Sequence, residues 1–170
     1  GHCIGVDPYY LIYKSKMEGY QPKLLSMARE INDFMPSHVV QSLLEMMVAN
    51  KLDLSRTVIT VLGITFKENV PDLRNSKALE IVNALVNLGL RVQVVDPYVE
   101  KNPFVEGTVD FTSIDEMNPS EIIILAVSHK EFKDPELIKR ILPLEKGMIM
   151  DLKGIIPAEA FDEKVTIWRL

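Results

Sequence analysis

The chain has 170 residues, of which 47% are hydrophobic and 25% are charged, and its formal net charge is −5. This length allows one ordinary domain with an appendage, and the high apolar content excludes intrinsic disorder. No run of about 18 apolar residues is present, so we expect no membrane span. An acidic balance without a Lys/Arg stripe argues against nucleic acid as a partner. A single cysteine excludes an internal disulfide and favours a cytoplasmic protein.

Residues 1–53 carry two helical patterns. Asp7 is predicted to cap the first helix, Pro8 to occupy its first helical position and Gly19 to end it. The chain begins without a methionine or a signal peptide, and we expect it to be a fragment of a longer protein.

A second helix is predicted from about residue 22 to residue 50, with a kink or break at Pro36, where a backbone donor is missing. Its apolar residues recur every three or four positions. A helical arm of this length has little of its own chain to cover it. We therefore expect these helices to form the interface of a homodimer, although packing on the same chain is an alternative.

Residues 54–170 alternate between strand and helix patterns. Such alternation implies βαβ units, and we predict an α/β fold with a doubly wound parallel sheet. The predicted strands are 57–63, 91–95, 109–111, 122–126, 148–150 and an edge strand at 165–168, and the predicted helical segments are 76–88, 114–117 and 135–141.

Cys3 and Asp7 lie at the start of the first predicted helix. A helix N-terminus favours the thiolate form of a cysteine, which is its nucleophilic form. Asp7 opposes the thiolate as a charge, but as a base it could activate water. The plainer interpretation is that Cys3 is a small buried apolar residue and that Asp7 is only a cap.

The loop after the first predicted strand is rich in charge. Carboxyl ends of parallel strands form the ligand crevice of open α/β sheets, and Lys153 follows another predicted strand at the same edge. Cations placed there could hold a phosphate or pyrophosphate, although a solvated loop would look the same. The residues that give the loop this character are Lys67, Glu68, Asp72, Arg74, Asn75 and Lys77.

Gly63 is the only glycine at the turn that follows the first strand, so the fingerprint G-x-G-x-x-G is missing. We therefore do not expect NAD to bind at this turn, and we interpret Asp96 as a turn residue rather than a ribose ligand. His2, His38 and His129 have no zinc-ligand spacing, and no metal site is predicted.

Two segments resemble signatures of the UDP-glucose/GDP-mannose dehydrogenase family. Residues 1–10 (GHCIGVDPYY) resemble its catalytic-cysteine loop, and residues 62–76 (LGITFKENVPDLRNS) resemble the start of its UDP-binding domain. Residues 31–33 and 94–97 also fit, and the resemblance covers nearly the whole chain. It implies a Rossmann-like UDP-binding domain at residues 54–170, preceded by the cysteine loop and the dimerisation helices.

The resemblance further implies a nucleotide-sugar 6-dehydrogenase, which oxidises the sugar C6 alcohol to a carboxylate with two NAD per turnover. Cys3 would hold the aldehyde as a thiohemiacetal and later carry a thioester, and Asp7 would assist the hydrolytic water. Phe66, Lys67 and, by a looser alignment, Lys153 match positions that contact the UDP-sugar.

Arg74 matches a position that reaches NAD bound by another domain. That N-terminal NAD-binding domain is not in this sequence, so we expect the chain alone to be inactive.

His2 and the run Asp-Pro-Tyr-Tyr resemble the branch that acts on UDP-N-acetylhexosamines, of the N-acetylglucosamine and N-acetylmannosamine types. Val6 stands where the UDP-glucose branch commonly has lysine. A UDP-glucose 6-dehydrogenase, or a non-catalytic nucleotide-binding or dimerisation module, is the alternative.

Overall fold

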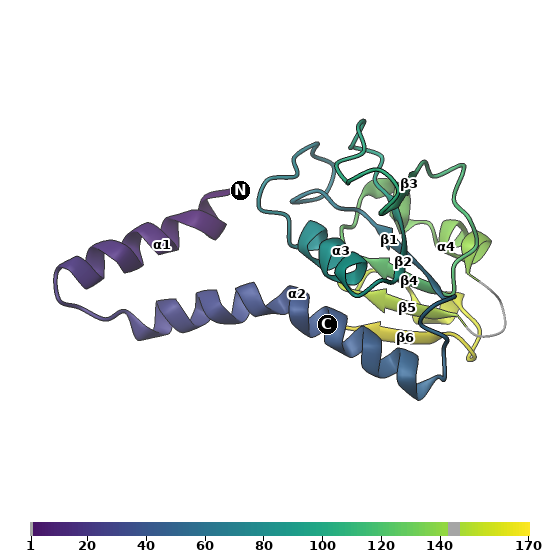
Figure 1. The fold of residues 1–170 in the computed structure, drawn as a ribbon, viewed down its shortest axis with the longest axis horizontal. Helices are drawn as coiled ribbons and strands as arrows, with labels where there is room; N and C mark the ends of the chain where they lie inside the picture. The colour runs from purple at the N-terminus through teal and green to yellow at the C-terminus, as the bar shows by residue number, and fades with distance from the viewer. Residues whose placement is uncertain (1, 143–146) are drawn as a thin grey trace.

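The computed structural model describes residues 2–142 and 147–170 and shows an α/β domain from which a helical hairpin projects (Figure 1). The hairpin is formed by α1 (His2–Met17) and the first half of α2 (Lys23–Ala49). We call residues 2–34 the arm. In the described part of the chain, no helix is long and apolar enough to cross a membrane.

A six-stranded sheet with the order β3-β2-β1-β4-β5-β6 forms the centre of the domain. Every pairing is parallel, which confirms the predicted fold class. The apolar, β-branched runs of the sequence lie in the central strands, which are buried on both faces. The strands are β1 (Val58–Leu62), β2 (Arg91–Val95), β3 (Asp110–Thr112), β4 (Ile122–Leu125), β5 (Met148–Asp151) and β6 (Thr166–Arg169).

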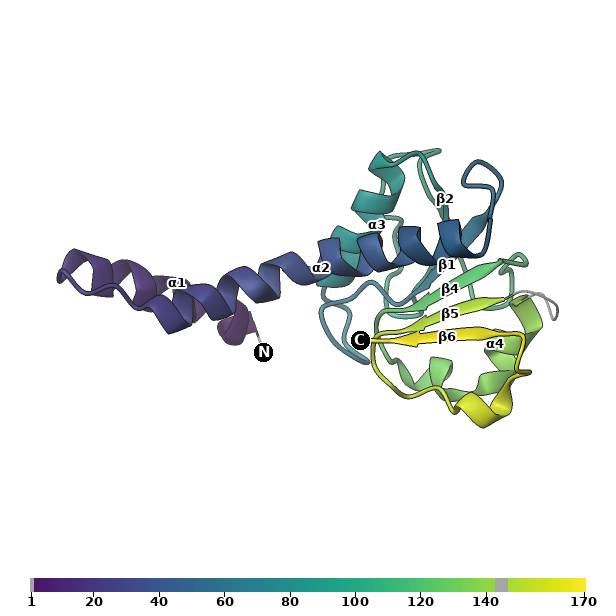
Figure 2. The same cartoon turned by 90° about the horizontal axis from the view of Figure 1, so that it is seen from below.

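Helices cover both faces of this sheet (Figure 2). The second half of α2 and α3 (Lys77–Asn87) pack on one face, where Val39, Leu43 and Met47 belong to the core. The opposite core lies beneath α4 (Pro135–Ile141) and the short 3₁₀ helix η1 (Lys130–Lys133). A second 3₁₀ helix, η2, spans Ala158–Ala160.

In the arm, α1 runs back alongside α2. Its N-terminal end is therefore the end of α1 nearer to the domain, as both views show (Figures 1 and 2). Gly19 ends α1 as predicted: it has φ of 78°, and its N–H donates to the carbonyl of Lys16. The N–H of Tyr20 donates to the carbonyl of Ser15, which completes a Schellman motif.

The predicted start of α1 is wrong. The helix begins at His2, so Asp7 is not its cap and Pro8 lies inside it. Pro8 lies in the second turn of α1, where its missing N–H costs one helical hydrogen bond, and the helix continues through it.

At Pro36 a kink or a break is predicted. A break is wrong, because α2 runs from Lys23 to Ala49 without interruption, but the helix changes direction about midway along its length (Figure 1). Pro36 is buried, and Val39 and Val40, which follow it, pack into the domain core. This packing offsets the loss of one backbone donor.

The helical segment predicted at 114–117 is a turn, in which the N–H of Glu116 donates to the carbonyl of Ser113. The buried amide of Gln93 on β2 holds the chain just beyond it. Its Oε1 accepts from the N–H of Asn118 at 2.8 Å, and its Nε2 donates to the carbonyl of Asn118 at 3.2 Å. These two bonds fix an extended segment against the sheet in place of a helix.

Candidate functional site at the carboxyl edge of the sheet

Residues 63–75, the β1–α3 loop, leave the carboxyl end of β1. Gly63 has φ of 84°, and its Cα lies so close to Val127 that an added Cβ would approach the Val127 Cβ to 2.5 Å. The N–H of Phe66 donates to the carbonyl of Asp72 at 2.7 Å and ties the two sides of the loop together. The loop ends at Ser76, whose hydroxyl caps α3 by accepting from the N–H of Leu79.

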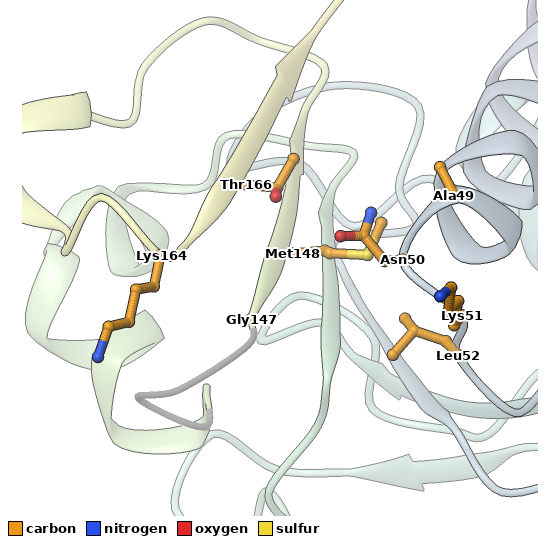
Figure 3. Close-up of a pocket in the computed structure, with 8 residues that line it drawn as sticks. All are labelled: Ala49, Asn50, Lys51, Leu52, Gly147, Met148, Lys164 and Thr166. Carbon is orange, nitrogen blue, oxygen red and sulfur yellow. The ribbon is translucent and has the colours of Figure 1, made fainter.

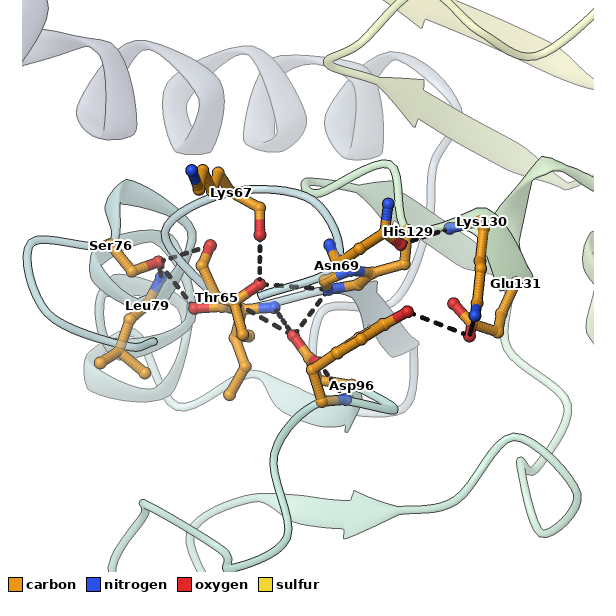
Figure 4. A network of polar contacts seen from close by, with 11 residues as sticks. Thr65, Lys67, Asn69, Ser76, Leu79, Asp96, His129, Lys130 and Glu131 are labelled. Atoms are coloured by element: carbon orange, nitrogen blue, oxygen red, sulfur yellow. Dashed lines mark hydrogen bonds and ion pairs between the residues drawn. The ribbon is translucent and has the colours of Figure 1, made fainter. Parts of the chain in front are cut away.

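The carboxylate of Asp96 anchors the start of this loop (Figure 4). Asp96 follows β2 and is buried, and its Oδ2 accepts from the N–H groups of Ile64 at 2.7 Å and Thr65 at 3.1 Å. Its Oδ1 accepts from the N–H of Tyr98, and the Nε2 of His129 lies 3.1 Å from Oδ2. Burial alone would raise the pKa of Asp96, but these hydrogen bonds outweigh it and hold the pKa below its usual value.

The interpretation of Asp96 as a simple turn residue is therefore incomplete. Besides the turn at Tyr98, it occupies the backbone N–H groups that would approach a pyrophosphate in a dinucleotide-binding turn. With an internal anion already bound to Ile64 and Thr65, and with Gly63 packed on Val127, this turn does not fit NAD.

His129 joins the network from the segment after β4, and its side chain is fully buried. Its Nδ1 accepts from the N–H of Asn69 at 2.9 Å, and its Nε2 lies 3.2 Å from the hydroxyl of Thr65. The ring stacks on Tyr98 with 4.7 Å between centroids. Neither His129 nor Asp96 was predicted as part of the site, because their partners lie about 30 to 60 residues away and no local pattern marks such pairs.

Two of the predicted substrate-binding cations lie at this edge. Lys67 is exposed, and Figure 4 shows its side chain extending away from the buried network. Lys153, after β5, places its ammonium 3.6 Å from Glu68, which also accepts a hydrogen bond from Ser128 at 3.0 Å. A hydrogen bond from its own backbone N–H, together with Ser128 and Lys153, lowers the pKa of Glu68 against the effect of burial.

The other two predicted binding residues also lie on the β1–α3 loop. Phe66 is half-buried. Arg74 is exposed and forms a bidentate pair with Asp72, at 3.1 and 2.7 Å.

A cavity of about 280 Å³ lies where α2, α3 and the ends of β4 and β5 meet. Lys77 and Lys153 both line it, together with Asn32 of α2. Lys77 pairs with Asp33 of α2 at 3.1 Å, so the arm-bearing helix contributes to the polar edge of the domain.

Cys3 and Asp7 lie one turn apart on α1. Cys3 is exposed, and both line an open cavity of about 530 Å³ together with Leu25 of α2. The hydroxyl of Tyr9 donates to Asp33, so α1 is tied to the same carboxylate that Lys77 binds. The structure thus brings Cys3 and Asp7 together on the arm and Lys77 and Lys153 together at the edge of the domain, as two separate groups.

A further cavity of about 280 Å³ opens at the opposite edge of the sheet, near the amino ends of β5 and β6 (Figure 3). Asn50, Lys51 and Lys164 are among its lining residues. Ligands of open parallel sheets bind at the carboxyl ends of the strands, so we place the candidate site at the edge that carries Lys67.

The fold and this edge define a class: a Rossmann-like α/β domain with cations above the carboxyl ends of its strands. Residues 60–158 match the UDP-binding domain of the UDP-glucose/GDP-mannose dehydrogenase family. The chain belongs to this family, as the sequence motifs predict.

Relatives with curated names cover nearly the whole chain. A UDP-N-acetyl-D-glucosamine 6-dehydrogenase from Salmonella typhi is 36% identical over 97% of this chain and 39% of its own length. A UDP-N-acetyl-D-mannosamine dehydrogenase from Methanocaldococcus jannaschii is 33% identical over 96% of this chain and 36% of its own length. The solved structure of a UDP-D-ManNAc dehydrogenase from Pyrococcus horikoshii matches 99% of this chain and 38% of its own with a TM-score of 0.78 and 29% identity. The chain thus spans about two fifths of the length of these relatives.

Proposed function

We propose that this chain supplies the UDP-sugar-binding domain and the catalytic-cysteine segment of a UDP-N-acetylhexosamine 6-dehydrogenase. The substrate would carry N-acetylglucosamine or N-acetylmannosamine, as the names of the relatives suggest. The observation that carries the proposal is the β1–α3 loop, which holds an exposed Lys67 at the carboxyl edge of the sheet by a buried hydrogen-bond network.

In this proposal the domain binds the UDP moiety. The ammonium groups of Lys67 and Lys153 attract the pyrophosphate oxygens, and Phe66 contacts the same ligand. Arg74, exposed at the end of the loop, reaches NAD held by another part of the enzyme, since the first turn of this domain does not fit the cofactor. NAD, when bound, would accept two hydrides per turnover: one as the C6 alcohol becomes an aldehyde, and a second as the thiohemiacetal becomes a thioester.

The arm supplies the nucleophile. The thiolate of Cys3 attacks the C6 aldehyde, and the new C–S bond holds the sugar as a thiohemiacetal while the aldehyde oxygen takes up a proton. Water releases the carboxylate from the thioester, with Asp7 one turn away as the group that accepts a proton from the water.

The proposed enzyme is a homodimer in the cytoplasm. The arm exposes large apolar side chains that nothing in the described chain covers, and a second copy would bury them. The second half of α2 is committed to its own domain, so the proposed interface lies on residues 2–34 rather than along the whole of 22–50.

UDP titration by calorimetry tests the binding site. We expect Lys67→Ala to weaken UDP binding about tenfold, because a charge-assisted contact is lost. Lys101→Ala, at an exposed lysine of the β2–β3 connection, is the matched control and should bind UDP as the original chain does. Equal affinities for the two variants would remove Lys67 from the site.

Activity of the chain alone is a separate test. We expect no steady-state NADH formation from this polypeptide with UDP-N-acetylglucosamine or UDP-N-acetylmannosamine, because its own first turn cannot hold NAD. Sustained NADH production by the purified chain would contradict the proposed division of roles.

A further inference from the structure

We infer that His129 is a positioning residue that fixes the segment of the β1–α3 loop carrying Phe66 and Lys67. The inference rests on the proposed UDP site. His129 comes from the segment after β4, yet its two ring nitrogens lie beside the two ends of this segment. Nδ1 accepts from the N–H of Asn69 at 2.9 Å, and Nε2 lies 3.2 Å from the Thr65 hydroxyl.

The hydrogen bonds define the protonation of the ring. Because Nδ1 accepts a backbone N–H, the proton of a neutral imidazole must lie on Nε2, where it is donated to the carboxylate of Asp96 at 3.1 Å. The ring is buried between Tyr98 and Phe132, with centroid distances of 4.7 and 5.6 Å. Asp96 therefore orients His129, and His129 presents a fixed acceptor to the loop.

The carboxylate and the imidazole together hold both ends of residues 64–69. Asp96 binds the N–H groups of Ile64 and Thr65, and His129 binds that of Asn69, which has φ of 58°. Between them, the hydroxyl of Thr65 donates to the carbonyl of Lys67 at 3.0 Å.

Lys67 thus stands on a backbone that is ordered before any ligand arrives. Ordering a mobile backbone on binding costs conformational entropy, so a preformed loop binds more tightly than a mobile one. A residue with no role beyond the core would stabilise the domain without affecting the affinity for UDP.

Two isosteric variants separate these roles. His129→Asn places an amide oxygen near the position of Nδ1 and keeps the acceptor for Asn69, whereas His129→Gln places an amide nitrogen near Nε2 and loses that acceptor. We expect His129→Gln to weaken UDP binding about tenfold and His129→Asn to stay within about threefold. Amide exchange should accelerate at Asn69 only in the Gln variant, and thermal unfolding of both variants reports any loss of the fold.

Nitrogen-15 shifts of the His129 ring in the original chain are expected to show a bare Nδ1 and a protonated Nε2. Equal UDP affinity in the two His129 variants, with faster exchange at Asn69 in one of them, would overturn the inference.

A second pair of variants tests the same idea from the loop if the His129 variants do not fold. Thr65→Val removes the hydroxyl that binds the carbonyl of Lys67, and Thr65→Ser restores it. We expect the Val variant, and not the Ser variant, to lose UDP affinity by about fivefold. Equal UDP affinity in these two variants would also overturn the inference.

Lys67→Ala in the same titration distinguishes the two proposals. If Lys67→Ala binds UDP normally, the assignment of Lys67 fails and the inference falls with it. If Lys67→Ala weakens UDP binding while His129→Gln does not, only the positioning role fails.

Discussion

The α/β domain buries its apolar side chains, whereas the arm exposes many of its own. In the domain all residues of β4 are buried, and both faces of the sheet are covered by helices. In the arm, Leu24 is 87% exposed and Tyr10 is 70% exposed, although the two helices follow regular patterns. Regular secondary structure alone does not supply stability, which comes from the surface that is buried. The domain has its own core, whereas the described arm leaves large apolar side chains exposed.

The two regions meet inside one helix. The first half of α2 exposes Met27, Ile31 and Phe34, and its second half buries Val39 and Leu43. The change falls near Pro36, so one continuous helix connects the exposed arm to the domain core. Substitutions on either side of this point should therefore have different effects.

The largest expected effect is on the domain side. Gly63→Ala requires a side chain at φ of 84° and within 2.5 Å of Val127, and we expect it to lower the free energy of unfolding by about 3 kcal/mol. Gly89→Ala is the matched control: its φ is 76°, but an added Cβ would meet nothing within 4 Å, so about 1 kcal/mol is expected. Denaturant unfolding measures both, and equal losses would show that the contact with Val127 does not matter.

An arm substitution should affect association rather than folding. Ile31→Glu places a charge on the proposed interface, and we expect dimer association to weaken by about 2 kcal/mol, or about 30-fold, in analytical ultracentrifugation. Unfolding of the domain should not change. Val105→Glu, at an exposed apolar residue of the domain, is the control. If both variants associate equally well, the interface lies elsewhere.

Acid should destabilise the domain through the protonation of Asp96. The pKa of Asp96 is lower in the folded state than its unfolded value of about 3.9, so the folded chain binds fewer protons in that range. Its contribution to stability is complete above about pH 4 and is lost as the pH falls through the folded pKa. Below about pH 4 the free energy of unfolding should therefore fall less steeply in Asp96→Asn than in the original chain. An unchanged pH profile of unfolding would contradict this role.

The sequence predicts the features that depend on local patterns. The apolar run at β1, the three-to-four spacing of α3 and the glycine that ends α1 each carry a local cause, and the structure has them within a few residues. The start of α1 was misjudged because Asp7 and Pro8 match the local pattern of a helix start, whereas the helix begins five residues earlier. At Pro36 the helix bends but is not interrupted (Figure 1). The turn near Asn118 depends on Gln93, which lies 25 residues earlier.

The candidate site likewise has features that local sequence patterns predict and features that depend on contacts between distant residues. The charges of the β1–α3 loop and Lys153 are visible in the sequence because they follow predicted strands. The network that orders the loop is not visible, since Asp96 and His129 meet only when β2 and β4 lie on either side of β1. Long-range pairing of this kind has no signature along the chain.

The smallest expected effect lies at Asp33, where the arm and the domain are linked. A hydrogen bond from Tyr9 outweighs the small effect of burial and, together with Lys77 and Arg29, lowers the pKa of Asp33. Its side chain is 43% exposed, so solvent screens these contacts, and Asp33→Asn should change the free energy of unfolding by less than about 0.5 kcal/mol. The orientation of α1 depends on it more strongly, because Tyr9 and Lys77 bind Asp33 from different helices. A fluorophore on Cys3 should therefore gain mobility in Asp33→Asn, and not in Asp115→Asn, at an exposed carboxylate remote from the arm. Equal anisotropy in both variants would show that apolar contacts alone hold α1 against α2.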